Sequence, residues 1–224
     1  MRNINISSGE YYHVYNRGND KQKIFLDERD WVRFLFCILY FQSPLTFINL
    51  SRPVSNFVKH SVFNIGKKMV GDIHNQRTVQ LNCFCLMPNH FHLLIYQKTE
   101  AGIAQYLQRV LNSYTKYFNT KYNRSGHLFQ GPYRAVHISD NNQLLYTSAY
   151  LHRNPMEIKN WQNKEDRYPW SSYQDYLNLD KNRWGLLLDQ KLSQNNLRMG
   201  ETIINGSRRV ELKTQIISKA CSDC

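Results

Sequence analysis

The chain has 224 residues, of which 42% are hydrophobic and 13% aromatic, and its 29 Lys and Arg against 17 Asp and Glu give a formal net charge of +12. This composition excludes a disordered chain, which could not bury enough apolar surface to offset its ordering entropy. There is no run of about 18–20 apolar residues that could span a membrane, and residues 1–10 lack the apolar core of a signal peptide. We therefore expect a globular, cytoplasmic protein whose positive charge favours a polyanion, with nucleic acid as the first candidate.

The N-terminal part of the chain predicts a strand followed by a helix. Residues 11–16 are aromatic and β-branched, as is typical of strands, and run into a turn. Asp27 can cap a helix, because the apolar residues after it recur at three- and four-residue spacing. These residues are Trp31, Phe34, Leu35, Ile38 and Leu39. From residue 43 to residue 77 the pattern is mixed and interrupted by proline and glycine, and we expect only a short helix there.

The middle of the chain predicts a β-hairpin and a second helix. Residues 79–86 and 90–97 have the pattern of strands, and the Met-Pro-Asn between them suits a tight connection. Between residues 103 and 118, apolar side chains recur at three- and four-residue steps, which indicates a long amphipathic helix.

A further strand and helix follow. Residues 135–138 are a short strand candidate, and Ser139 or Asp140 can cap the next helix. This helix should end near Asn154, because Pro155 disfavours the helical conformation in the residue before it.

The order strand, helix, strand, strand, helix, strand, helix is that of a ferredoxin-like α+β fold. We expect an antiparallel sheet with the helices on one face. After Tyr176 the chain becomes polar. The sequence therefore predicts a main domain over residues 1–176 and a C-terminal extension over residues 177–224 whose role it does not reveal.

A pair of histidines stands out in the second strand of the hairpin. His90 and His92 are separated by Phe91. Because strand side chains alternate between faces, both imidazoles should project from one face and could converge on a divalent metal, while Phe91 points into the core. Histidine pairs of this kind are also common as solvated or hydrogen-bonded side chains, so the pair alone leaves both interpretations open.

The third predicted helix presents a polar face that includes Tyr150 and Asn154. These residues are four positions apart, which places a phenol and a carboxamide oxygen one helical turn from each other. From spacing alone, an ordinary core tyrosine and a helix-capping asparagine remain the favoured interpretation.

Several segments together resemble the REP-associated tyrosine transposases, a bacterial branch of the insertion-sequence-200-like single-tyrosine HUH transposases. The segments are HVYNRG at 13–18, MPNHFHLL at 87–94, SGHLFQGPYR at 125–134, YLHRNP at 150–155 and WSSY at 170–173. The resemblance spans most of the chain up to Tyr176. It implies a ferredoxin-like sheet that carries the histidine pair on a central strand and a tyrosine on a following helix.

The resemblance also implies the chemistry. His90 and His92 would be ligands of a Mg²⁺ or Mn²⁺ ion with Asn154 as the third, and Tyr150 would be the nucleophile. The implied reaction is nicking and rejoining of single-stranded DNA through a 5′-phosphotyrosine, at hairpin or repeat sequences. Two other tyrosines compete by their place in a helix, Tyr114 and Tyr117, but the family pattern places the tyrosine before x-x-x-Asn-Pro, as in Tyr150.

The expected partner is single-stranded DNA beside a hairpin. The cationic side chains that we expect to contact phosphates are Arg17, Lys116, Lys121, Arg124 and Arg134. The rings that we expect to stack on bases or line a groove are His127, Phe129 and Tyr133. Related transposases act as dimers, which makes a homodimer a further expectation, although no residue pattern marks an interface.

Two alternatives remain open at this point. The chain could be a DNA-binding protein that keeps the fold without the reaction, or a metal-dependent phosphodiesterase that uses water as its nucleophile. The first predicts DNA binding that does not depend on Tyr150 or on metal. The second predicts turnover without a covalent intermediate.

Overall fold

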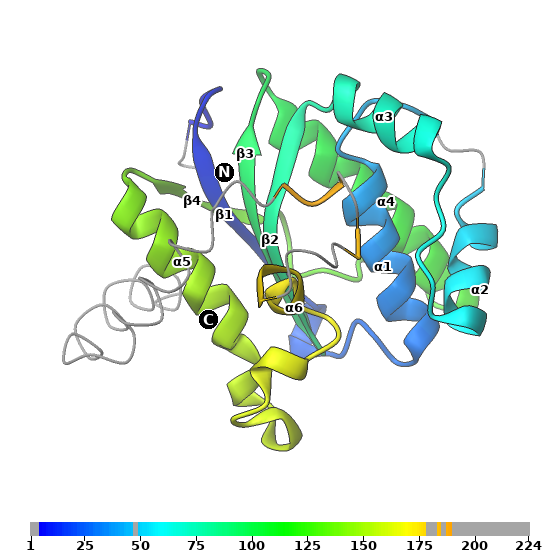
Figure 1. Cartoon of the computed structure of the whole chain (residues 1–224). Helices are drawn as coiled ribbons and strands as arrows, with labels where there is room; N and C mark the ends of the chain where they lie inside the picture. Colours follow the sequence, from blue (N-terminus) through cyan, green and yellow to red (C-terminus); the bar gives the residue numbers. More distant parts are fainter. Residues whose placement is uncertain (1–4, 47–48, 178–182, 185–186, 190–224) are drawn as a thin grey trace.

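The computed structural model describes residues 5–46, 49–177, 183–184 and 187–189. Its centre is a four-stranded sheet in the order β2-β3-β1-β4, with antiparallel neighbours throughout (Figure 1). The strands are β1 Tyr11–Arg17, β2 Val79–Met87, β3 His90–Gln97 and β4 Arg134–Ile138. This order, with helices between β1 and β2 and between β3 and β4, confirms the ferredoxin-like α+β fold predicted from the sequence.

Two long helices cover one face of the sheet, as predicted. They are α1, Glu28–Tyr40, and α4, Gly102–Lys121. The side chain of Asp27 caps α1 by accepting a hydrogen bond from a main-chain N–H of the first turn. Phe91 of β3 packs against Phe34 of α1 with 5.0 Å between ring centroids. The main core therefore lies between β3 and these two helices.

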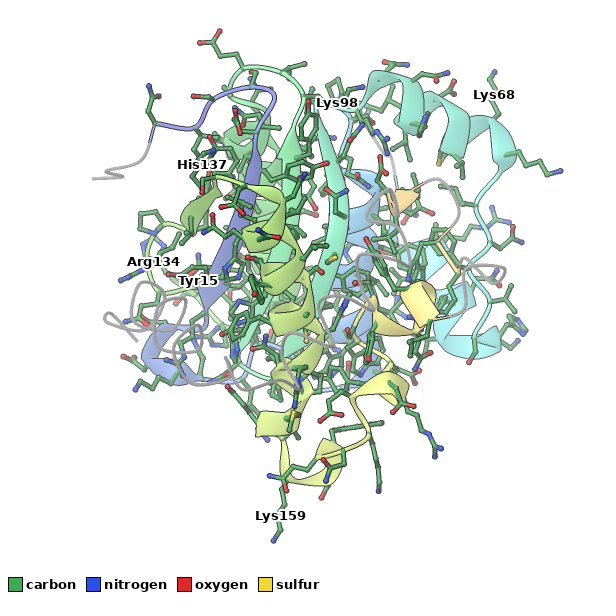
Figure 2. The ribbon with its side chains drawn as sticks, turned by 60° about the vertical axis from the view of Figure 1, so that its left-hand side comes forward. Tyr15, Lys68, Lys98, Arg134, His137 and Lys159 are labelled. Atoms are coloured by element: carbon green, nitrogen blue, oxygen red, sulfur yellow. The ribbon has the colours of Figure 1, made fainter. Side chains whose placement is uncertain are left out.

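The third helix, α5 (Asn141–Arg153), lies on the opposite face of the sheet, in front of the strands in Figure 2. The expectation that the helices cover one face thus holds for α1 and α4 but not for α5. The reason is that this second face also carries fully buried apolar side chains, such as Cys85 and Leu94. These side chains must be shielded from water, and α5 packs over them with its buried Leu144 and Leu151.

The segment that the sequence left largely unassigned folds as two helices, α2 (Ser51–His60) and α3 (Lys67–Gln76), where only one short helix was expected. They have few buried residues, Val54 in α2 and Ile73 in α3, and the apolar periodicity is correspondingly weak. Both lie on the side of the molecule away from α5 (Figure 1).

The chain after α5 covers the outer edge of β2. It runs through 3₁₀ turns and a short helix: η2 Asn154–Glu157, η3 Lys159–Trp161, η4 Glu165–Arg167 and α6 Tyr173–Leu177. The main-chain N–H of Leu86 donates to the carbonyl of Trp170 over 2.9 Å, and that of Ser172 donates to Phe84 over 3.0 Å. Trp170 and Ser172 belong to the WSSY segment, which therefore protects an open strand edge.

Residues beyond the predicted boundary at Tyr176 pack against the same core. Trp184, Leu187 and Leu188 are buried, and the N–H of Asp189 donates to Leu81 of β2 over 2.8 Å. The division at residue 176 stays a prediction, and the extension from residue 190 onward lies outside the described residues. Within the described part of the chain, no helix is long and apolar enough to cross a membrane.

Candidate active site

The histidine pair of β3 faces α5, as the strand alternation predicts. The rings of His90 and His92 lie 5.0 Å apart between centroids and perpendicular to each other. Phe91 points to the other face and belongs to the main core. His92 is buried, and His90 is half-buried at the end of the strand. The two imidazoles therefore share one corner of the sheet.

A third histidine joins them from β1. His13 lies beside His92, with its Nε2 atom 2.9 Å from Nδ1 of His92 and the two rings stacked at 5.1 Å. Tyr15, two residues further along β1, is the direct partner of His92 in the pairing of β1 with β3. Sequence reasoning did not give a role to His13 or Tyr15. The signal that could have found them is the alternation His-x-Tyr-x-Arg in β1, which places all three on the face of the histidine pair once the strands are paired.

Burial keeps these histidines neutral. Desolvation lowers the pKa of His13 to about 4. Desolvation, reinforced by the positive charge of Arg17, also lowers the pKa of His90 to about 4. Burial again lowers the pKa of His92 well below its ordinary value, with smaller contributions from the neighbouring His90 and His13. Neutral imidazoles carry a lone pair, which is the form that binds metal ions.

The predicted nucleophile reaches this corner from α5. Asp140 caps the helix by accepting a hydrogen bond from the N–H of Gln143 over 2.9 Å. Two and a half turns later, the half-buried ring of Tyr150 lies edge-on to His92 at 5.9 Å and to His13 at 6.1 Å. The tertiary structure thus brings Tyr150 to the histidines, although 58 residues (150 − 92) separate it from His92 in the sequence.

The two competing tyrosines have structural roles elsewhere. The hydroxyl of Tyr114 is buried and donates to the carbonyl of Ile24. That of Tyr117 donates to Asp30 of α1 over 2.9 Å. Both belong to α4, on the face of the sheet that is opposite to the histidine pair. Neither is placed to share a substrate with His90 and His92.

Asn154 stands directly after α5, where the sequence also allowed a helix-capping role. Its Nδ2 atom donates to the carbonyl oxygen of Tyr150 over 2.9 Å and to that of Leu151 over 3.3 Å. These bonds cap the last turn of α5 and leave the amide oxygen of Asn154 as the atom that can take a ligand. The capping bond also ties Asn154 to the main chain of the predicted nucleophile.

A buried hydrogen bond fixes the end of α5 to the edge of β2. His152 Nε2 lies 2.9 Å from the hydroxyl oxygen of Ser172, which also accepts a hydrogen bond from the N–H of Phe84 over 2.9 Å. The ring of His152 stacks on Tyr173 at 5.1 Å. The YLHRNP and WSSY segments are thus in direct contact, which holds the end of α5 against the edge of β2.

The buried histidines predict a stability that depends on pH. Desolvation lowers the pKa of His152 to about 3, from an ordinary value of 6.5. The unfolded chain therefore binds more protons than the folded one, and the free energy of unfolding falls as the pH falls from 6.5 towards 3, by about 2 kcal/mol for each such histidine at about pH 5. Urea unfolding of the parent and of His152→Gln at about pH 7 and pH 5 measures this. Between these pH values the free energy of unfolding of the variant should fall by about 2 kcal/mol less than that of the parent. An equal fall in both proteins would contradict the low pKa of buried His152.

Two of the predicted phosphate contacts adjoin the histidines. Arg17 pairs with His90 in the register of β1 with β3, and its buried Nε atom has no hydrogen-bond partner in the described structure. Arg134 of β4 is exposed and lies next to Tyr15, as Figure 2 shows. A buried guanidinium N–H without a partner is suited to an anion.

An open pocket of about 790 Å³ lies between α4 and the loop that leads to β4. Its walls include three further predicted contacts: Lys116 and His127, which are exposed, and the mostly buried Phe129. The loop is joined to the active-site end of β1, because the N–H of Gln130 donates to the carbonyl of Arg17 over 2.8 Å. The pocket therefore lies next to the end of β1, on the α4 side of the sheet.

The remaining predicted contacts are engaged elsewhere. Lys121 forms ion pairs with Asp27 and Asp30 at 2.6 and 2.7 Å, which hold α4 against the start of α1. Phe129 and Tyr133 are buried, at 7% and 4% exposure, and belong to the core, although Phe129 also lines the pocket. The structure therefore engages Lys121 in ion pairs and Tyr133 in the core, because packing rather than charge or ring type decided their positions. The guanidinium of Arg124 lies over the Phe118 ring at 5.6 Å.

The donor atoms at the histidine pair fit a divalent cation. Among the residues that the structure describes, no cluster of three or more His, Cys, Asp or Glu side chains is arranged to hold a metal. His90 and His92 each engage Nδ1 in a hydrogen bond, with Asn89 and with His13 respectively, so Nε2 is the nitrogen open to a cation. The amide oxygen of Asn154 and phosphate oxygens of a substrate would supply the other ligands. Such a mixed nitrogen and oxygen set suits Mn²⁺ better than Mg²⁺.

One family model matches part of the chain. The model of the family described as IS200-like transposase matches residues 47–154. This stretch contains both histidines of β3, Tyr150 and Asn154. No curated protein matches the chain.

Two solved structures resemble the chain. One is described as a REP-associated tyrosine transposase bound to a REP hairpin; it is 11% identical, with a TM-score of 0.52, over 86% of this chain and 92% of that one. The other is described as a candidate transposase from Deinococcus radiodurans R1; it is 13% identical, with a TM-score of 0.33, over 66% of this chain and 92% of that one. The first likeness shows a shared fold.

Proposed function

Because residues 47–154 match the model of the IS200-like transposases, we propose that the chain is a transposase of this kind, and that it nicks and rejoins single-stranded DNA through a covalent bond to Tyr150. One observation carries the proposal. The Tyr150 ring on α5 lies edge-on to His13 and His92 of the central strands, and the half-buried Arg17, whose Nε atom has no hydrogen-bond partner in the described structure, lies next to His90. A nucleophile, a cation site and a phosphate-binding charge therefore meet in one corner.

In this proposal His90, His92 and Asn154 hold a Mg²⁺ or Mn²⁺ ion. When bound, such an ion neutralises charge on a phosphate oxygen and thereby lowers the barrier to attack by an oxygen nucleophile. Burial keeps both imidazoles unprotonated, so they do not have to lose a proton before binding. The guanidinium of Arg17 lies beside His90 and binds the same phosphate through its unpartnered Nε.

Tyr150 supplies the attacking atom. Its phenol oxygen forms a bond to phosphorus as the bond from phosphorus to the 3′ oxygen breaks; the phenol proton passes to solvent, and the leaving 3′ oxygen takes up a proton from solvent. The products are a 5′-phosphotyrosine and a DNA strand that ends in a 3′-hydroxyl. Because the enzyme-bound intermediate is still a phosphodiester, a 3′-hydroxyl can attack it later, restore the phenol and join strands without ATP.

The expected substrate is single-stranded DNA that flanks a hairpin. A phosphate in a single strand can approach Tyr150, whereas one in a duplex is held by its base-paired partner. The pocket with Lys116 and His127 offers cationic and ring contacts close to the active-site end of β1. The fold shared with a transposase bound to a REP hairpin supports this substrate class. The expected homodimer stays a prediction, which light scattering of the purified chain can test.

The test is a labelled-strand assay with a library of DNA hairpins whose single-stranded flanks are randomised. The DNA is incubated with the protein and Mn²⁺ and analysed on denaturing gels. A 5′-phosphotyrosine retains the downstream fragment, so a 3′ label should move with the protein and a 5′ label should not. Peptide mapping should place the DNA on Tyr150, and EDTA should abolish the adduct.

Other outcomes favour the alternatives. Cleavage in which neither label stays on the protein would indicate a phosphodiesterase that uses water. Salt-sensitive binding without cleavage, indifferent to EDTA, would indicate a protein that only binds DNA. An adduct on Tyr114 or Tyr117 would contradict the assignment of the nucleophile while preserving the reaction.

Two lysines of α4 provide a matched test of the DNA surface. Lys116 is exposed in the pocket, whereas Lys121 is held by two carboxylates. We expect Lys116→Gln to weaken binding of a hairpin oligonucleotide several-fold. It should also reduce the slope of log affinity against log salt concentration by about one, since one phosphate contact is lost. Lys121→Gln should leave binding unchanged and lower the free energy of unfolding by about 2 kcal/mol, because it removes a charged hydrogen-bond partner from buried Asp30. Fluorescence anisotropy measures DNA binding, and urea unfolding measures stability. Weaker DNA binding by Lys121→Gln with unchanged binding by Lys116→Gln would contradict the roles given to the two lysines.

A further inference from the structure

Each histidine of the proposed cation site forms a hydrogen bond with a neighbouring side chain. Nδ1 of His90 lies 2.7 Å from the amide oxygen of Asn89. Nδ1 of His92 lies 2.9 Å from Nε2 of His13. In both cases the hydrogen bond engages Nδ1, so Nε2 is the nitrogen of each ring that is left for the cation.

The hydrogen bond of His90 defines its tautomer. An amide oxygen can only accept, so Nδ1 of His90 must carry the ring proton and Nε2 the lone pair. The bond between His13 and His92 is different, because either ring can be the donor. Only one arrangement, with the proton on Nδ1 of His92, leaves the lone pair on its Nε2 and matches His90.

We propose that His13 is a positioning residue that accepts a hydrogen bond from Nδ1 of His92 and so fixes His92 in the tautomer whose Nε2 binds the divalent cation. This inference rests on the cation site of the proposed function and adds a residue outside the ligand set. Ligating histidines in proteins commonly donate their second N–H to an acceptor, which orients the ring and raises its basicity.

The packing of His13 suits this role. The side chain comes from the centre of β1 and is 2% exposed, so solvent does not compete for the hydrogen bond. Its ring stacks on His92 and meets the edge of Tyr150 at 6.1 Å, while Tyr15 lies on another side at 5.2 Å. These contacts restrict rotation of the imidazole. His13 therefore bridges the strand pair and the helix that carries the nucleophile.

The first experiment measures Mn²⁺ binding in the absence of DNA, from the electron paramagnetic resonance signal of the free ion. His13→Phe keeps a ring but has no acceptor, and should weaken Mn²⁺ binding about 10- to 100-fold. His13→Gln keeps an acceptor near the position of Nε2 and should stay within about threefold of the parent. His137→Phe, a change at an exposed histidine of β4, is the control and should bind as the parent does.

Nitrogen-detected NMR of the parent protein without metal is the second measurement, and its result does not depend on whether His13→Phe folds. The His92 ring, assigned by its loss in His92→Gln, should show a protonated Nδ1 and an unprotonated Nε2. A proton on Nε2 of His92, or unchanged Mn²⁺ affinity in folded His13→Phe, would overturn the role of His13 and leave the proposed function standing. Failure of the parent itself to bind Mn²⁺ would overturn the cation site of the proposed function, and this inference with it.

Discussion

Replacing Tyr150 with phenylalanine is expected to reduce DNA cleavage at least about 10³-fold and to abolish the covalent adduct. The substitution removes one oxygen atom, which is the atom that bonds to phosphorus in the proposed reaction. The ring still packs edge-on against His13 and His92, so the fold should be retained. Quantification of the 3′-labelled adduct over time, with folding monitored by circular dichroism, measures the effect.

Tyr146 provides the matched control for this experiment. It lies one turn earlier on α5 and is also half-buried. Tyr146→Phe should therefore keep cleavage within about threefold of the parent, because no proposed step uses its hydroxyl. If Tyr150→Phe formed the adduct as well as Tyr146→Phe does, Tyr150 would not be the nucleophile and the proposed mechanism would be wrong.

Replacing Asp189 with alanine is expected to lower the free energy of unfolding by about 3–5 kcal/mol. The Asp189 carboxylate forms an ion pair with Arg77 at 2.8 Å, and both side chains are almost fully buried, at 5% and 4% exposure. Removing the carboxylate leaves a buried guanidinium without its counter-charge. Urea unfolding of the parent and the variant at neutral pH measures the loss.

Two controls separate the ion pair from other effects. The double variant Arg77→Leu and Asp189→Leu removes both charges and should recover most of the lost stability. Asp166→Ala breaks an exposed contact with Arg167 and should leave the unfolding midpoint unchanged. A small effect of Asp189→Ala would show that residues after Tyr176 contribute little to the core, as the sequence-based boundary implies.

The sequence predicted those features that depend on local spacing. Alternation along a strand placed His90 and His92 on one face and Phe91 on the other, and the structure has this arrangement. Three- and four-residue periodicity predicted α1 and α4, and the cap candidates Ser139 and Asp140 together with Pro155 predicted α5; in the structure Asp27 caps α1 and Asp140 caps α5. These patterns are local because strand and helix geometry repeat over a few residues.

The sequence did not predict the features that depend on long-range packing. A basic or aromatic residue type does not reveal its partner, so Lys121 was expected at DNA but binds Asp27 and Asp30. Tyr133 was expected to stack on bases or line a groove but is part of the core. The helices α2 and α3 have too few buried residues to give a clear period.

By itself, the sequence determined the ferredoxin-like order of elements, the histidine pair and the motif that singles out Tyr150. Only the tertiary structure decided that α5 crosses the second face of the sheet and brings Tyr150 to the histidines, and that His13 stands behind His92. The physical reason is that the pairing of β1 with β3 is made by main-chain hydrogen bonds, which do not depend on side-chain type, and this pairing brings His13 and His92 together although they are 79 positions apart in the sequence.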